Sequence, residues 1–142
     1  MSNAALVWPM FAMVLLTASV LVRLFRSRVR AVRSGAVTAG YFRAFQGAVE
    51  PEQSAVLSRH FANLFEAPTL FYAGCITAMV LHDVGPVTVV LAWSYVIARA
   101  LHTTVHLGRN RLKYRIRSYF ISWLMLLALW AHLAWSAAMG HV

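Results

Sequence analysis

Residues 4–25 read AALVWPMFAMVLLTASVLVRLF, a run in which the first charged residue is Arg23. About 20 helical residues are needed to cross the hydrocarbon core of a bilayer, so this run is long enough to span it. Three further apolar stretches of comparable length follow at residues 58–81, 84–106 and 119–139. The sequence therefore predicts an all-α integral membrane protein, a four-helix bundle in one domain over residues 1–142, with a basic loop at residues 26–57.

The composition of the chain excludes most soluble classes of protein. Of its 142 residues, 61% are hydrophobic and 12% are charged, whereas soluble domains average roughly 45–50% apolar and ~25% charged residues. Half of the usual charge cannot cover a surface that faces water on all sides. Cys75 is the only cysteine, which excludes a disulfide-bonded scaffold.

The basic residues predict how the chain is oriented in the membrane. Most of the 13 Lys and Arg residues follow the first and the third apolar stretch, whereas the turn at Gly85 and both chain ends have none. The positive-inside rule then places both basic segments in the cytoplasm and both termini outside it. We expect a bacterial inner-membrane protein whose arginines contact anionic lipids and do not bind nucleic acid.

Three polar residues interrupt the second apolar stretch and share one helical face. Arg59, Asn63 and Glu66 are spaced by four and then three residues. An ionisable residue inside a membrane segment is by default a candidate for function. Glu66 is the only acid in an apolar stretch, and it needs a cation or hydrogen-bond donors. Pro68 predicts a kink that widens the space beside Glu66.

The third apolar stretch carries a basic face of its own. Arg99, His102, His106 and Arg109 are spaced by three, four and three residues. We expect this face to meet the polar face of the second stretch, or a neighbouring subunit, and to form a pocket for an anionic ligand. Two alternatives stay open. The cluster could have the structural role alone of holding the helices in register, or Arg59 or Arg109 could reach the lipid headgroups. No metal site is predicted.

The motif in the second stretch resembles that of the MAPEG superfamily (membrane-associated proteins in eicosanoid and glutathione metabolism). Arg59-x-x-x-Asn63-x-x-Glu66-x-Pro68 carries the likeness, and the run from Asn63 to Tyr72 is similar to a prokaryotic branch. The likeness extends over essentially the full chain. It implies a homotrimer of four-helix subunits with glutathione, as co-substrate, at a subunit interface in the cytoplasmic half.

The third stretch resembles the other marked segment of that family, through Ala98-Arg99-x-x-His102-x-x-x-His106. His102 and His106 stand where the eicosanoid-making members have tyrosines, and imidazole can also hydrogen-bond glutathione. The remaining residues for which the resemblance implies glutathione binding are Arg59, Asn63, Glu66 and Arg99. It also implies a basic residue that stabilises the thiolate, for which the candidates are Arg109, Arg111 and Lys113.

The function that the resemblance implies is a glutathione-dependent transferase or a peroxidase-like activity. Its second substrate would be a hydrophobic electrophile that enters from the bilayer. The alternative is a non-catalytic membrane module, either a lipid-binding protein or an accessory subunit of a larger membrane complex. The polar cluster would then be purely structural. An ion pathway ranks last, because the outer halves of the helices are too apolar for a continuous polar track.

Overall fold

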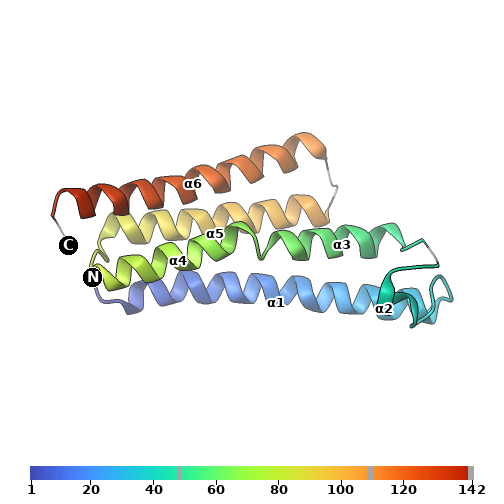
Figure 1. Cartoon of the computed structure of the whole chain (residues 1–142). Helices are drawn as coiled ribbons and strands as arrows, with labels where there is room; N and C mark the ends of the chain where they lie inside the picture. Colours follow the sequence, from blue (N-terminus) through green and yellow to red (C-terminus); the bar gives the residue numbers. More distant parts are fainter. Residues whose placement is uncertain (48, 109–110, 141–142) are drawn as a thin grey trace.

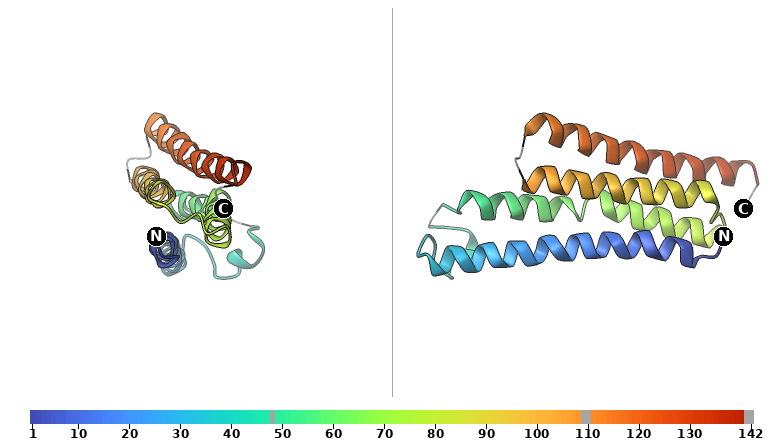
Figure 2. Two further views of the ribbon diagram at one scale, coloured as in Figure 1. Left: turned by 90° about the vertical axis from the view of Figure 1, so that its left-hand side faces the viewer. Right: turned by 180° about the vertical axis from the view of Figure 1, so that it is seen from behind.

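The computed structural model describes residues 1–47, 49–108 and 111–140, and within these ranges it is helical without strands. Its elements in chain order are α1 (Ala4–Arg33), α2 (Tyr41–Ala44), α3 (Glu52–Asn63), α4 (Ala67–Val80), α5 (Pro86–Leu107) and α6 (Leu112–Ala138). The long helices run side by side, with α3 and α4 following one another along α1 and with α6 packed on α5 (Figures 1 and 2).

The start of α1 and the end of α6 lie at the same end of the molecule (Figure 1). The long basic segment between α1 and α3 lies at the opposite end. This arrangement is the one that the predicted topology requires, while the orientation relative to a membrane stays a prediction. Within the described residues, α1 and α6 are the two helices that are long and apolar enough to cross a bilayer.

Two of the helices that flank the basic segments, α1 and α6, are longer than the sequence predicted. Helix α1 was expected to end at residue 25 but continues to Arg33, and α6 was expected to begin at residue 119 but begins at Leu112. The expected loop at residues 26–57 accordingly contains the end of α1, all of α2 and the first half of α3. The reason is that charge ends a membrane span without ending a helix, since Arg and Lys have high helix propensity.

The second apolar stretch, predicted as one kinked helix over residues 58–81, is two helices. Helix α3 ends at Asn63 and α4 begins at Ala67. Pro68 occupies the first turn of α4 and not the interior of a helix. Its missing N–H and its ring, which would collide with the carbonyl of Leu64, are tolerated only where a helix starts. The expected kink is therefore a complete break at residues 64–66.

The core between these helices contains stacked and closely packed side chains. The rings of Phe71 on α4 and Tyr95 on α5 stack with their centroids 4.6 Å apart. Gly74 brings α4 close to α6, because a Cβ added there would lie 3.3 Å from Leu129. The indole N–H of Trp130 donates to the carbonyl of Leu70 at 3.1 Å. Small residues such as Gly74 allow helix backbones to approach closely in membrane proteins.

Candidate functional site

The break between α3 and α4 places Asn63 against Arg99 of α5. The Nη2 group of Arg99 donates to the Asn63 side-chain oxygen at 2.8 Å and to the Asn63 backbone carbonyl at 3.1 Å. That carbonyl is available because the helix ends there and no following turn uses it. The two polar faces that the sequence indicated therefore meet at Asn63 and Arg99.

Arg99 is fully buried, with 0% of its surface exposed. Its Nε and Nη1 groups have no hydrogen-bond partner among the described residues. A buried guanidinium is costly unless it is paired, because a low-dielectric environment disfavours the charge. Arg99 therefore retains donors for an anionic acceptor that the described part of the chain does not provide.

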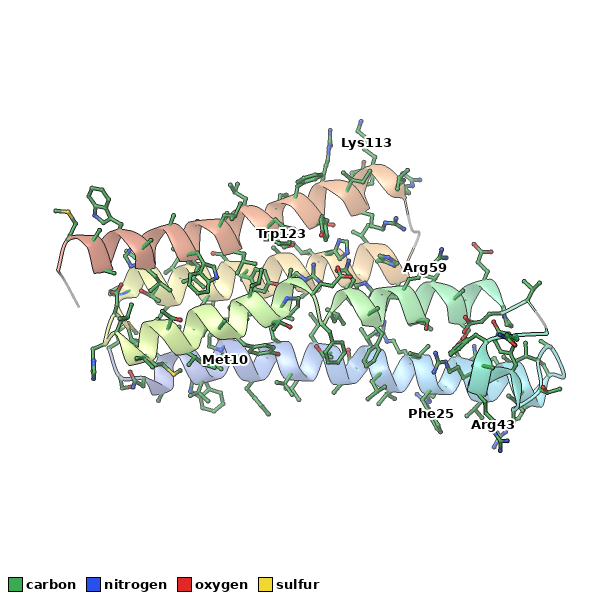
Figure 3. The ribbon with its side chains drawn as sticks, in the orientation of Figure 1. Met10, Phe25, Arg43, Arg59, Lys113 and Trp123 are labelled. Atoms are coloured by element: carbon green, nitrogen blue, oxygen red, sulfur yellow. The ribbon has the colours of Figure 1, made fainter. Side chains whose placement is uncertain are left out.

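Glu66 does not supply that acceptor within one chain. It lies in the break before α4, it is exposed, and no hydrogen bond or ion pair joins it to Arg99. Arg59, on the same face of α3, is also exposed (Figure 3). Glu66 thus contributes nothing to the Asn63–Arg99 contact, whereas Arg59, although exposed, lines one of the cavities described below.

Three histidines gather beside the Asn63–Arg99 pair. The ring of His60 lies 4.5 Å from that of His106 and 5.6 Å from that of His102, measured between centroids. His102 and His106 were expected here, whereas His60 was not singled out. The signal was present, since His60 precedes Asn63 by three residues and so lies on a neighbouring part of the same helix face. In the described ranges, no group of three or more His, Cys, Asp and Glu side chains is arranged to hold a metal ion.

Hydrogen bonding assigns the proton positions of two of these rings. The Thr103 hydroxyl donates to the Arg99 carbonyl at 2.9 Å, so His60 Nε2, 3.0 Å from the same hydroxyl oxygen, is the donor in their contact. His102 Nδ1 lies 3.2 Å from the Arg115 carbonyl, which can only accept. The neutral rings therefore keep His60 Nδ1 and His102 Nε2 as acceptors.

Two adjoining cavities open at this cluster, between α3, α5 and α6. One has a volume of about 230 Å³ and the other of about 250 Å³. Asn63, His106 and Arg115 line both of them, while His102 lines the first and Arg59 the second. Each is smaller than the roughly 300–1,000 Å³ of common ligand pockets, and together they fall in the lower part of that range.

The residues expected to stabilise a thiolate are placed differently. Arg109 lies outside the described residues. Lys113 is exposed on α6, projects away from α5 and lines neither of the two cavities (Figure 3). Arg111 lines a separate cavity of about 310 Å³ near Thr104.

Arg115 is the residue that sequence reasoning missed at this position. It lines both cavities, yet it was grouped with the basic loop because α6 was expected to begin at residue 119. Once α6 is known to start at Leu112, Arg115 and Ser118 fall on successive turns of one helix, beside His102. The helical periodicity of the basic segment was the signal that would have found it.

Comparison with known proteins agrees with this architecture. Residues 6–135 match the profile of the MAPEG family, which is a membrane family generally associated with glutathione. No match was found among curated proteins or among solved structures. The family match and the two apolar helices α1 and α6 make the chain an integral membrane protein. Because the match extends over nearly the whole sequence, this chain belongs to the MAPEG family.

Proposed function

We propose that this protein binds glutathione at the Asn63–Arg99 pair and promotes its reaction with hydrophobic electrophiles dissolved in the bilayer. The observation that carries the proposal is the buried Arg99 guanidinium, which holds Asn63 and has two nitrogen positions without partners in the described chain. A carboxylate is the natural acceptor for a guanidinium, and glutathione has two of them.

The side chains around the two cavities suit the rest of such a ligand. Arg59 and Asn63 offer donors to a second carboxylate or to a peptide carbonyl. His102 Nε2 offers an acceptor for an N–H or S–H group. When bound, glutathione supplies the sulfur nucleophile, so the chemistry requires no nucleophile from the protein. Cys75, which is fully buried in the core, is not needed.

We assign stabilisation of the thiolate to Arg115. A guanidinium close to a thiol favours its deprotonated, nucleophilic form through opposite charge. Arg115 projects from α6 into the space that Asn63 and His106 also line. This position suits the role better than that of the exposed Lys113.

We further propose that α3 and α4 act as one broken span of a four-helix bundle, and that three copies form a homotrimer. Glu66 and Arg59 support this arrangement, because both are exposed on the single chain. An exposed carboxylate at membrane depth needs a partner, and a basic side chain of a neighbouring subunit would provide one. The protein would lie in a bacterial inner membrane, with both termini on the side away from the cytoplasm.

Calorimetric titration of glutathione into the purified protein in detergent tests the proposal. Wild type should bind saturably at millimolar glutathione, Arg99→Ala should not, and Arg43→Gln, which changes an exposed arginine remote from the cavities, should bind like wild type. Turnover of 1-chloro-2,4-dinitrobenzene then tests catalysis. Absence of wild-type binding would favour a non-catalytic membrane module.

The double variant Glu66→Gln with Arg99→Met separates a binding site from a structural cluster. Size-exclusion chromatography with light scattering reports its oligomeric state. An intact oligomer that no longer binds glutathione supports the site. A variant that loses its oligomeric state shows that the cluster holds the helices together.

A further inference from the structure

A cavity of about 440 Å³ lies between the second half of α1, the first half of α3 and the end of α5. It is larger than either cavity of the proposed glutathione site and shares only His106 and Val56 with them. We refer to it as the basic cleft. Its lining residues are Arg23, Arg26, Ser27, Arg30, Glu52, Gln53, Val56, Leu57, His106, Leu107 and Gly108.

The basic cleft carries an excess of positive charge. Arg23, Arg26 and Arg30 are spaced by three and four residues, so they lie on one face of α1. Among the described residues, Glu52 is the only acid that lines the cleft. Arg30 donates to the Gln53 side-chain oxygen at 3.4 Å. Arg23 and Arg26 form no ion pair with a carboxylate of the described residues. The cleft therefore presents guanidinium groups to an anion, and phosphate matches their geometry well.

The position of the basic cleft along α1 indicates an amphiphile and not a soluble ion. Arg23 is the first charged residue of the helix, so the cleft begins where the apolar run ends. Leu15 and Val22 precede Arg26 by eleven and four residues, which places them on the same face. They are 53% and 54% exposed. A hydrocarbon chain along these residues would lead directly to a headgroup beside Arg26.

The inner wall of the cleft adds an apolar contribution. Val56 and Leu57 of α3 and Leu107 of α5 line it together with the arginines. Basic pockets between helices on the cytoplasmic side of a membrane are typical sites for the phosphorylated headgroups of lipids. The positive charge of the cleft, its position at the end of the apolar run and the apolar residues beside it therefore all indicate an anionic lipid.

We propose that the basic cleft binds the phosphodiester headgroup of an anionic phospholipid, with its acyl chains along Leu15 and Val22. The headgroup phosphate accepts hydrogen bonds from Arg23 and Arg26. Arg30, held by Gln53, borders the same space. This proposal concerns a separate site and does not depend on the glutathione chemistry.

Native mass spectrometry of the protein in a non-ionic detergent tests the proposal. Phosphatidylglycerol and phosphatidylcholine with identical chains are added at equal concentration, and the bound fraction of each is measured. Wild type should retain phosphatidylglycerol about tenfold more than phosphatidylcholine. Both lipids carry the phosphodiester, but the quaternary ammonium of choline cancels its charge and is repelled by the arginines of the cleft, and a difference of about 1.4 kcal/mol gives this ratio. Arg23→Gln with Arg26→Gln should remove this preference.

Arg43→Gln with Arg117→Gln is the matched control. It removes the same charge from two exposed arginines outside the basic cleft, so the preference for phosphatidylglycerol should remain. Gln53→Glu is an independent variant on α3. It places a carboxylate beside Arg30 and should weaken phosphatidylglycerol binding without removing any arginine.

Three results would overturn the proposal. Equal loss in the cleft variant and the matched control would show unspecific attraction to a basic protein. Competition by inorganic phosphate as effective as by phosphatidylglycerol would identify a free-anion site. Loss of glutathione binding in Arg23→Gln with Arg26→Gln, with phosphatidylglycerol binding intact, would assign the cleft to glutathione. The lipid measurement does not require glutathione, so failure of the proposed function would leave it unaffected.

Discussion

Replacing Arg99 by Met should affect ligand binding and stability in opposite directions. Met has a long, flexible and uncharged side chain, so it fills much of the same volume. The substitution removes the two hydrogen bonds that Nη2 donates to Asn63. It also removes a fully buried charge that has no carboxylate partner in the described chain.

The expected magnitudes follow from these two losses. Replacing buried ionic groups by apolar residues of similar volume is often neutral or stabilising, by about 1–4 kcal/mol. Asn63 is half-buried, and solvent can satisfy its oxygens once Arg99 is gone. A hydrogen bond to a charged group is worth about 1.5–3 kcal/mol, so glutathione affinity should fall by roughly 10- to 150-fold. The melting temperature should stay equal or rise.

Two measurements on the same detergent-purified sample check this prediction. Titration calorimetry gives the glutathione dissociation constant, and thermal melting followed by circular dichroism gives the midpoint. Arg43→Met serves as the control, since Arg43 is exposed and lies on α2, away from the site. A lower melting temperature with unchanged glutathione affinity would refute the reasoning, because Arg99 would then be a structural residue alone.

Other substitutions test the site and the packing. Arg115→Gln should lower kcat by about 10²-fold while glutathione still binds, because it removes one group that stabilises developing charge. Lys113→Gln is the control and should leave kcat unchanged. Equal effects of the two substitutions on kcat would contradict the assignment of Arg115. Gly74→Val should lower the free energy of unfolding by about 1–3 kcal/mol, because the larger side chain overpacks against α6. Thermal melting measures this change. An unchanged melting temperature would show that α4 and α6 can separate to accommodate the side chain. Gly108→Ala should also lower the midpoint, because its Cβ would lie 2.8 Å from a backbone carbonyl oxygen; a stabilised variant would contradict the described end of α5.

The sequence predicted the class of the fold because apolar length is a direct physical requirement of a bilayer. It predicted the ends of the helices less well. Hydropathy reports where an apolar run ends, whereas the same helix continues past that run to Arg30 and Arg33. The break at residues 64–66 was not predicted either. Pro68 fits both a kink inside one helix and the first turn of a new helix, and the sequence alone does not distinguish the two.

The candidate site was predicted in part, for reasons of geometry. The spacing of Arg59, Asn63 and Glu66 identified one face, but spacing within a helix does not say which member reaches a neighbouring helix. The structure selects Asn63 for that contact and leaves Glu66 exposed. Arg115 was not placed because α6 was expected to begin at residue 119, and a residue assigned to a loop has no defined facing direction.

The break between α3 and α4 has a consequence for how the chain enters a membrane. A continuous helix satisfies its own backbone and can cross the bilayer alone. Here the carbonyl of Asn63 receives its hydrogen bond from Arg99, which is synthesised 36 residues later. Before α5 is present, that carbonyl lacks this partner. If α5 entered the bilayer alone, Arg99 would contact lipid without the Asn63 side chain that accepts its hydrogen bond. We therefore expect the broken span proposed above and α5 to enter the membrane as a pair and not one after the other.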